Sequence, residues 1–204
     1  FTWVYAVITN RLIDASFGYY IFPILSVLFG FIFFEENINK KKLFSIILVF
    51  ISIIYLLFIY KSIPWIGIVV AISWSTYNLI RKKIKVDTDT GLFIESLLIL
   101  PFIIIVFYII TKNNYNDFDI SNPSLMLILI LAGPMTVIPL FLYVKGVELS
   151  GLGPAGMIFY ITPTLQFILG YFMFNEPLNI QKLVSFFLIW IAVFIYLKDL
   201  YEKN

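Results

Sequence analysis

The chain has 204 residues, of which 61% are hydrophobic and 13% are charged, whereas soluble domains are about 45–50% apolar and about 25% charged. This composition excludes an ordinary soluble domain, and the formal net charge of +2 is too small to suggest a nucleic-acid partner. Cysteine and histidine are absent, which excludes disulfides, thiolate or imidazole metal sites, cysteine nucleophiles and histidine-dependent triads, so we expect no enzyme, no cofactor and no metal site.

Eight apolar segments follow one another along the chain, and most are long enough to cross a bilayer core of about 30 Å as a helix. We expect helices at residues 1–9, 16–34, 43–60, 64–80, 91–111, 125–144, 154–174 and 181–197. The fold class is therefore an all-α membrane protein, a polytopic helical bundle in the lipid bilayer. Segment 1–9 is too short to span and has no charged region before it, so we expect an N-terminally truncated fragment that begins inside a helix.

The segment Ala15–Gly30 recurs 140 residues later as Ala155–Gly170. Over residues 15–45 and 155–185, twelve of the 31 aligned pairs are identical. They include a proline and a glycine of the apolar part and three residues of the polar loop that follows: Pro23/Pro163, Gly30/Gly170, Glu36/Glu176, Asn39/Asn179 and Lys42/Lys182. A hydrophobic helix that contains a proline and recurs in this way is typical of a transporter built from two related halves.

The positive charges of the loops predict the orientation. If the spans alternate in direction, ten of the 14 Lys and Arg residues follow segments 16–34, 64–80, 125–144 and 181–197 and lie on one side. The remaining four lie on the other side: Arg11, Lys61, Lys112 and Lys182. Because an excess of Lys and Arg marks the cytoplasmic side, we expect a cytoplasmic C-terminus.

The two copies of the repeat are five spans apart and must therefore cross the membrane in opposite directions. This is an inverted-topology repeat, in which both halves share a site near the midplane. Counting back by the length of the shift leaves about two and a half helices absent before Phe1, so we expect an inverted 5+5 repeat of which about 7.5 helices are present. Residues 1–60 would be the C-terminal part of the first repeat, and residues 64–204 the second repeat.

Glu95 is the only carboxylate predicted to lie within an apolar span. A charge in hydrocarbon costs about 2.5–3.5 kcal/mol on insertion scales, so Glu95 is a candidate for binding a cationic group or a proton and coupling it to transport. Three other interpretations stay open: interfacial depth, stabilisation of the positive end of its helix, and an ion pair with Arg81 or Lys82.

Three prolines within the predicted spans, Pro23, Pro139 and Pro163, are candidate hinges, because each removes a backbone donor and frees a carbonyl four residues earlier. Polar side chains lie close to two of them. Together with Glu95, these are our candidates for lining a substrate cavity: Tyr19, Tyr160, Thr164 and Gln166. The alternative for the hydroxyls is a hydrogen bond to their own helix backbone, which would only shape a kink.

Small residues recur four positions apart in two segments, a spacing that lets helices approach closely. We interpret them as packing motifs: Gly67, Ala71 and Ser75 in one segment, Ser26 and Gly30 in the other. Membrane-interface anchoring and pore lining both stay open for three further residues: Trp74, Tyr77 and Asn78.

An ordered set of short motifs covers nearly the whole chain. It comprises Ala15-Ser16-x-Gly18-Tyr19 with Pro23 and Gly30, Arg81-Lys82-Lys83, Thr90-Gly91-x-x-x-Glu95 with Pro101, Ala132-Gly133 with Thr136 and Pro139, Tyr160-Ile161-x-Pro163-Thr164-Leu165, and Ile189-Trp190. This set resembles the drug/metabolite transporter superfamily in its EamA branch, and more narrowly the RarD family. The resemblance implies a ten-helix inverted repeat in the bacterial inner membrane with a central cavity.

The chain departs from the family pattern at four positions, three of which are polar in the family: Tyr5 in place of Trp, Ile8 and Phe22 in place of Asn, and Phe159 in place of Gln. The resemblance therefore implies no particular substrate. It implies a secondary transporter that moves a small organic metabolite or drug-like compound across the cytoplasmic membrane by alternating access. The alternatives are a lipid-handling protein and a non-transporting integral membrane subunit, and a homodimer is an alternative to a monomer.

Overall fold

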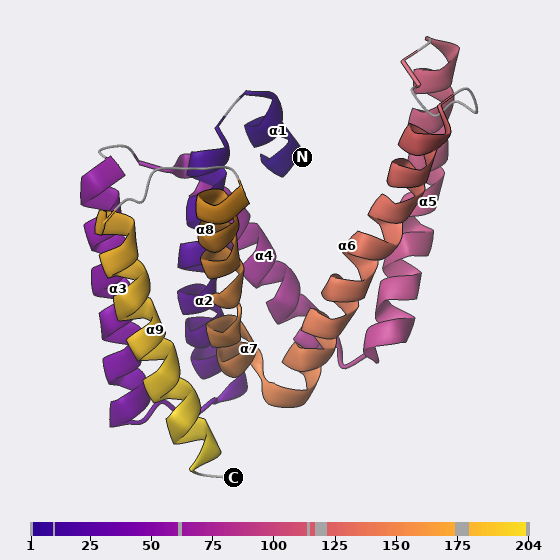
Figure 1. Ribbon diagram of the computed structural model, residues 1–204. Coiled ribbons are helices and arrows are strands. Elements are labelled where there is room, and N and C mark those ends of the chain that lie inside the picture. Colours follow the sequence, from indigo (N-terminus) through magenta and orange to yellow (C-terminus); the bar gives the residue numbers. More distant parts are fainter. Residues whose placement is uncertain are drawn as a thin grey trace. The chain divides into compact units, whose positions relative to one another are not determined.

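The computed structural model describes residues 2–9, 11–60, 63–113, 115–116, 122–173 and 180–202. Within these residues the chain forms nine α-helices and no strand (Figure 1). The helices are α1 (Thr2–Ile8), α2 (Leu12–Phe34), α3 (Lys40–Tyr60), α4 (Trp65–Ile84), α5 (Thr88–Lys112), α6 (Pro123–Ser150), α7 (Leu152–Ile158), α8 (Ile161–Met173) and α9 (Ile180–Tyr201). The predicted all-α class is confirmed.

Five of these helices are long and apolar enough to cross a membrane: α2, α3, α5, α6 and α9. They correspond to five of the predicted segments; α2 and α3 end where predicted, and the other ends lie one to six residues further out. Helix α4 continues past its predicted end at residue 80, through Arg81, Lys82 and Lys83, to Ile84. Basic residues suit this position because the C-terminal end of a helix carries a partial negative charge.

The prediction of one helix over 154–174 is wrong, because a turn at Phe159 and Tyr160 divides it into α7 and α8. Pro163 has no N–H group to donate to the carbonyl oxygen of Phe159, four residues earlier. That oxygen instead accepts from the N–H of Thr162 at 2.9 Å, a tighter, three-residue pattern. Pro23, by contrast, lies inside α2 without interrupting it.

The chain divides into two compact units, residues 1–80 with 150–204, and residues 81–149. The first unit joins parts of both predicted repeats, because α2 lies beside α7 and α3 beside α9 (Figure 1). Its core consists of side chains that are at least nine-tenths buried: Val27, Val49, Ile53, Met157, Tyr160, Ile189, Ala192, Val193 and Tyr196. Between helices in a bilayer, close van der Waals packing of this kind replaces the hydrophobic effect as the source of stability.

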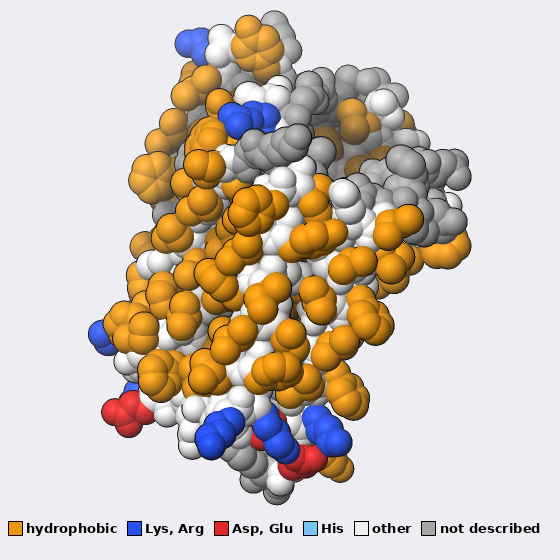
Figure 2. All heavy atoms as spheres, turned by 90° about the vertical axis from the view of Figure 1, so that its left-hand side faces the viewer, with side chains coloured by type: hydrophobic (Ala, Val, Ile, Leu, Met, Phe, Trp, Pro, Cys, Tyr) orange, Lys and Arg blue, Asp and Glu red, His pale blue; other side chains and the backbone are white. Residues whose placement is uncertain are grey.

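The outward face of α3 and α9 is apolar along most of its length (Figure 2). Its exposed side chains include Phe44, Phe50 and Phe58 on α3 and Phe187 and Phe194 on α9. Charged side chains gather at one end of this face (Figure 2). An apolar band that ends in charges is the surface expected of helices that face lipid.

Candidate functional site

The two copies of the repeat meet at residues that are equivalent in sequence. The hydroxyl of Tyr160 donates a hydrogen bond of 2.8 Å to the carbonyl oxygen of Tyr20, 140 residues earlier. The rings of Tyr19 and Phe159, which the same shift relates, lie 5.8 Å apart between centroids. Contact between equivalent residues is the arrangement expected where a two-fold axis relating the copies passes between them.

Along this contact, α2 and α7 run in opposite directions. As the chain advances from Leu152, the first residue of α7, to Tyr160, just after this helix, its contacts on α2 and the loop after α2 move back from Glu36 through Ser26 to Tyr20. Helices α3 and α9 are also antiparallel, because Asn39 and Lys41 at the start of α3 contact Asp199 and Glu202 at the end of α9. Their starts, at residues 40 and 180, and the starts of α2 and α7, at 12 and 152, differ by the same 140 residues. This antiparallel pairing agrees with the inverted repeat predicted from the sequence.

Two of the predicted cavity residues hydrogen-bond within the first unit. Tyr160 is 1% exposed, and its hydroxyl is engaged with Tyr20. The hydroxyl of Thr164 donates to the carbonyl oxygen of Tyr160 at 2.8 Å and accepts from the indole nitrogen of Trp190 at 3.1 Å. The side chain of Gln166, a third predicted cavity residue, lies outside the described residues.

Tyr19, the fourth candidate, is half-buried within a group of aromatic side chains. Phe159 contacts both Tyr19 and Phe22, the latter edge-on at 4.9 Å, and Phe22 contacts Trp74 of α4 at 6.3 Å. Trp74 in turn stacks on Tyr77 at 5.3 Å. This aromatic group joins α2, α4 and the turn between α7 and α8.

Glu95, the fifth candidate, belongs to the second unit and forms an ion pair with Arg81. Arg81 also donates to the carbonyl oxygen of Thr88 at 2.7 Å. A Cβ at Gly91 would lie 2.5 Å from a guanidinium nitrogen of Arg81, so glycine at this position makes room for the pair. The ion pair with Arg81 is one of the interpretations that the sequence left open for Glu95, and the structure contains it.

Glu148 stabilises the start of α5 in the same unit, a role that the sequence did not indicate. Its carboxylate accepts from the backbone N–H of Thr88 at 3.2 Å and from the Thr88 hydroxyl at 2.6 Å. Lys145 donates to its other oxygen at 2.8 Å. A carboxylate at a helix N-terminus is favourable because that end carries a partial positive charge.

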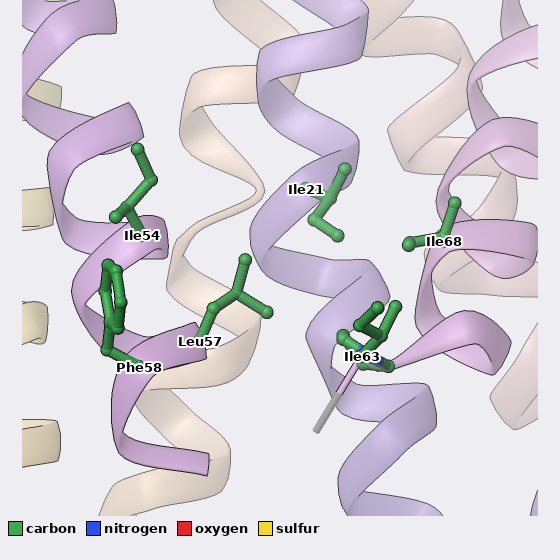
Figure 3. Close-up of a pocket in the computed structure, with 7 residues that line it drawn as sticks. Ile21, Ile54, Leu57, Phe58, Ile63 and Ile68 are labelled. Atoms are coloured by element: carbon green, nitrogen blue, oxygen red, sulfur yellow. The ribbon is translucent and has the colours of Figure 1, made fainter. Parts of the chain in front are cut away.

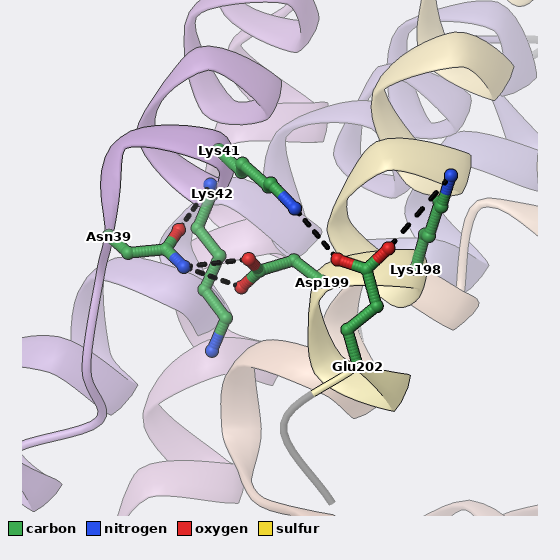
Figure 4. A network of polar contacts seen from close by, with 6 residues as sticks. All are labelled: Asn39, Lys41, Lys42, Lys198, Asp199 and Glu202. Atoms are coloured by element: carbon green, nitrogen blue, oxygen red, sulfur yellow. Dashed lines mark hydrogen bonds and ion pairs between the residues drawn. The ribbon is translucent and has the colours of Figure 1, made fainter.

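At one end of the first unit, a polar network joins the start of α3 to the end of α9 (Figure 4). The side-chain nitrogen of Asn39 donates to both oxygens of Asp199 at 2.7 Å. Lys41 donates to Glu202 at 2.7 Å, and this hydrogen bond, together with the charge of Lys41, lowers the pKa of Glu202. The nearest sequence signal was the identity of Asn39 and Asn179 in the two polar loops.

The first unit also has an open, apolar pocket of about 470 Å³ (Figure 3). Its lining comes from α2, α3, α4 and the residues just before α4: Ile21, Ile54, Leu57, Phe58, Ile63, Pro64 and Ile68. None of these side chains has a polar group. Among the described residues there is also no group of three acidic side chains that could hold a metal ion.

Comparison with known proteins places these features in a family. The model of the EamA-like transporter family matches residues 61–198. An uncharacterized transporter of Vibrio cholerae is 34% identical over 96% of the chain and 65% of its own length. The uncharacterized transporter YojE of Bacillus subtilis and Protein RarD of Escherichia coli are both 32% identical over 96% of the chain, and over 65% and 66% of their own lengths. The chain thus spans about 65% of the length of these relatives.

Proposed function

The chain belongs to the EamA-like transporter family, and from this premise we propose that it acts in a secondary transporter. The transporter moves a small organic metabolite or drug-like compound across the cytoplasmic membrane of a bacterium by alternating access. The C-terminus, with the polar network of Asn39 and Asp199, faces the cytoplasm, as the loop charges predict.

The observation that carries this proposal is the antiparallel contact of equivalent residues at Tyr20 and Tyr160. Two inverted halves can open alternately to either side of the membrane if they rock about a fixed region between them. The region around Tyr20 and Tyr160 is suited to be fixed, because a point near a two-fold axis moves least. Pro23 lies three residues after Tyr20, and Pro163 three residues after Tyr160, so both are placed to act as hinges. Pro139, inside α6, is a third.

The cavity residues have unequal roles in this proposal. Tyr19 is half-buried and presents an aromatic wall. The hydroxyl of Tyr160 is bonded to Tyr20 and reaches a substrate only when the helices around it separate, whereas the hydroxyl of Thr164 has one acceptor site left for a substrate. Gln166 lies on α8 two residues beyond Thr164, and Glu95 is the candidate for coupling transport to a cation or a proton.

The test is a thermal-shift screen of the purified protein against a metabolite library, followed by flux of the best ligand into proteoliposomes. A ligand that binds the folded state raises the apparent melting temperature. We expect at least one ligand that both stabilises the protein and crosses the membrane in a saturable manner. Stabilising ligands without any flux would contradict transport.

The apolar pocket favours a second candidate, lipid handling. Its lining offers carbon surface only, and several lining side chains, including Ile54, Phe58 and Ile63, are exposed. Such a pocket suits a lipid acyl chain better than a polar metabolite. Spin-labelled phospholipid that is immobilised by the protein, and released when Ile21 is replaced by Trp to fill the pocket, would favour this candidate.

A further inference from the structure

Three polar side chains of the first unit are buried without the partners that buried polar groups normally have. Ser26 of α2, and Ser75 and Asn78 of α4, are each 1% exposed. Within the described part of the chain, neither serine hydroxyl has a hydrogen-bond partner, and nor has the side-chain oxygen of Asn78. Because most buried polar atoms are hydrogen-bonded, each of these exceptions needs an explanation.

Several other serine and threonine hydroxyls of the helices have hydrogen-bond partners. Six of them donate to the carbonyl oxygen one turn earlier, which is the usual solution inside a helix. Those that do so are Ser45, Ser73, Ser96, Thr136, Thr164 and Ser185. Ser52, which is 0% exposed, donates across the helix interface to the carbonyl oxygen of Ser185 at 2.9 Å. It is therefore a buried serine with a satisfied hydroxyl.

The three exceptions lie on two helices that contact each other. A Cβ at Gly18 of α2 would lie 2.9 Å from the carbonyl oxygen of Gly67 of α4, and further along both helices Phe22 contacts Trp74. The two helices therefore run in the same direction here. Ser26 is one turn beyond Phe22, whereas Ser75 and Asn78 are one and four residues beyond Trp74. All three thus follow the same aromatic contact.

Helix α7 borders this region through Gly156. A Cβ at Gly156 would lie 2.7 Å from the Cβ of Ser26, so the two backbones are closely packed. Separation of α7 from α2 would therefore uncover the side chain of Ser26. On α4, the stacked rings of Trp74 and Tyr77 lie next to Ser75 and Asn78 in the helix and offer a flat apolar surface.

We propose that Ser26, Ser75 and Asn78 are the hydrogen-bonding groups of a substrate path that is closed in this conformation. The inference rests on the proposed transport function and deepens it. The side-chain oxygen of Asn78 can only accept, and its nitrogen already donates to the carbonyl oxygen of Trp74 at 2.7 Å. The ligand that completes these groups is a neutral organic molecule with N–H or O–H donors on a flat apolar body.

None of the 204 residues is a cysteine, which allows a direct test with introduced cysteines. The variants Ser26→Cys, Ser75→Cys and, as the matched control, Ser52→Cys are reconstituted in liposomes and treated with the water-soluble reagent methanethiosulfonate ethylsulfonate. If the path opens to water, positions 26 and 75 react about tenfold faster than position 52, because a local opening exposes them more often. Equal rates at the three positions would overturn the inference.

Alanine variants give a second measurement that does not depend on labelling. Ser26→Ala and Ser75→Ala remove a hydroxyl that has no partner, so we expect an unchanged or higher melting temperature. Ser52→Ala removes a hydroxyl that has one, so we expect a lower melting temperature. A fall in Ser26→Ala and Ser75→Ala as large as in Ser52→Ala would show that these hydroxyls stabilise the closed fold and would overturn the inference.

Both measurements work without a substrate and therefore separate the inference from the proposed function. Normal flux with slow labelling at positions 26 and 75 overturns the inference alone. Fast labelling without flux of any ligand overturns transport and leaves a water-accessible polar path.

Discussion

The carboxylate of Glu36 accepts hydrogen bonds from the first two backbone N–H groups of α7, those of Leu152 at 2.8 Å and Gly153 at 2.9 Å. Glu36 lies two residues past the end of α2, so this contact fixes the end of one helix against the start of the helix that carries the repeated sequence. The carboxylate also faces Gly30, where a Cβ would lie 2.4 Å from one of its oxygens. Gly30 of α2 and Gly153 of α7 have no Cβ and so leave room for the carboxylate of Glu36.

Replacing Glu36 by Gln should lower the stability of the folded protein by about 1–2 kcal/mol, the range for loss of a helix cap together with its charge. The amide places an NH₂ group against one of the two N–H donors, and it lacks the negative charge that the helix end favours. The measurement is the melting temperature in detergent. Glu35→Gln is the control, since its side chain is exposed. Equal melting temperatures for the two variants would show that the cap contributes nothing.

Replacing Gly156 by Ala should separate α2 from α7. The added Cβ would lie 2.7 Å from the Cβ of Ser26 and 3.2 Å from the carbonyl oxygen of Pro23, and neither atom is the flexible end of a side chain. Overpacking of this kind costs about 1–3 kcal/mol. We expect a lower melting temperature.

Two glycines of α6 provide the control for this substitution. A Cβ at Gly133 or Gly146 would meet no atom within 4 Å. Alanine is the better helix former by about 0.8–1.0 kcal/mol, so Gly133→Ala and Gly146→Ala should leave the melting temperature unchanged or raise it. An unchanged or higher melting temperature for Gly156→Ala would show that α2 and α7 do not pack as closely as described here.

Replacing Tyr160 by Phe tests the contact between the repeat-equivalent residues. The ring stays, but the hydrogen bond from its hydroxyl to the carbonyl oxygen of Tyr20 is lost. We expect a loss of about 0.5–1.5 kcal/mol in the free energy of unfolding. Tyr55→Phe, at a side chain that is 37% exposed on α3, should change stability less. A larger loss of stability in Tyr55→Phe than in Tyr160→Phe would show that the hydrogen bond between Tyr160 and Tyr20 does not stabilise the contact between the two copies.

The sequence predicted the helices and their pairing more fully than the contacts that hold them. Long apolar segments and a shift of 140 residues sufficed to predict that 16–34 and 154–174 run in opposite directions. The polar contacts that lock the ends join residues far apart in the chain, such as Glu36 and Leu152 or Asn39 and Asp199, and no local periodicity predicts which residues meet.

The break between α7 and α8 was also beyond the sequence pattern. Pro23 and Pro163 occupy equivalent places, yet only the second copy is interrupted, at Phe159 and Tyr160. A proline weakens a helix by removing one hydrogen bond, and the surrounding packing decides whether the helix continues past it. Hydrophobicity alone does not contain that information.

Replacing Glu95 by Gln should separate a coupling role from a structural one. Glu95 is 43% exposed and paired with Arg81, and ion pairs as open as this contribute at most about 1 kcal/mol. Glu95→Gln should therefore fold and express normally. Arg81→Met should be more destabilising, because the Arg81 side chain is 9% exposed and also donates to Thr88.

If Glu95 couples transport to a proton or a cation, Glu95→Gln abolishes uptake driven by the ion gradient in vesicles while the melting temperature stays nearly constant. Wild-type uptake by Glu95→Gln would remove Glu95 from the transport mechanism and leave it as the partner of Arg81.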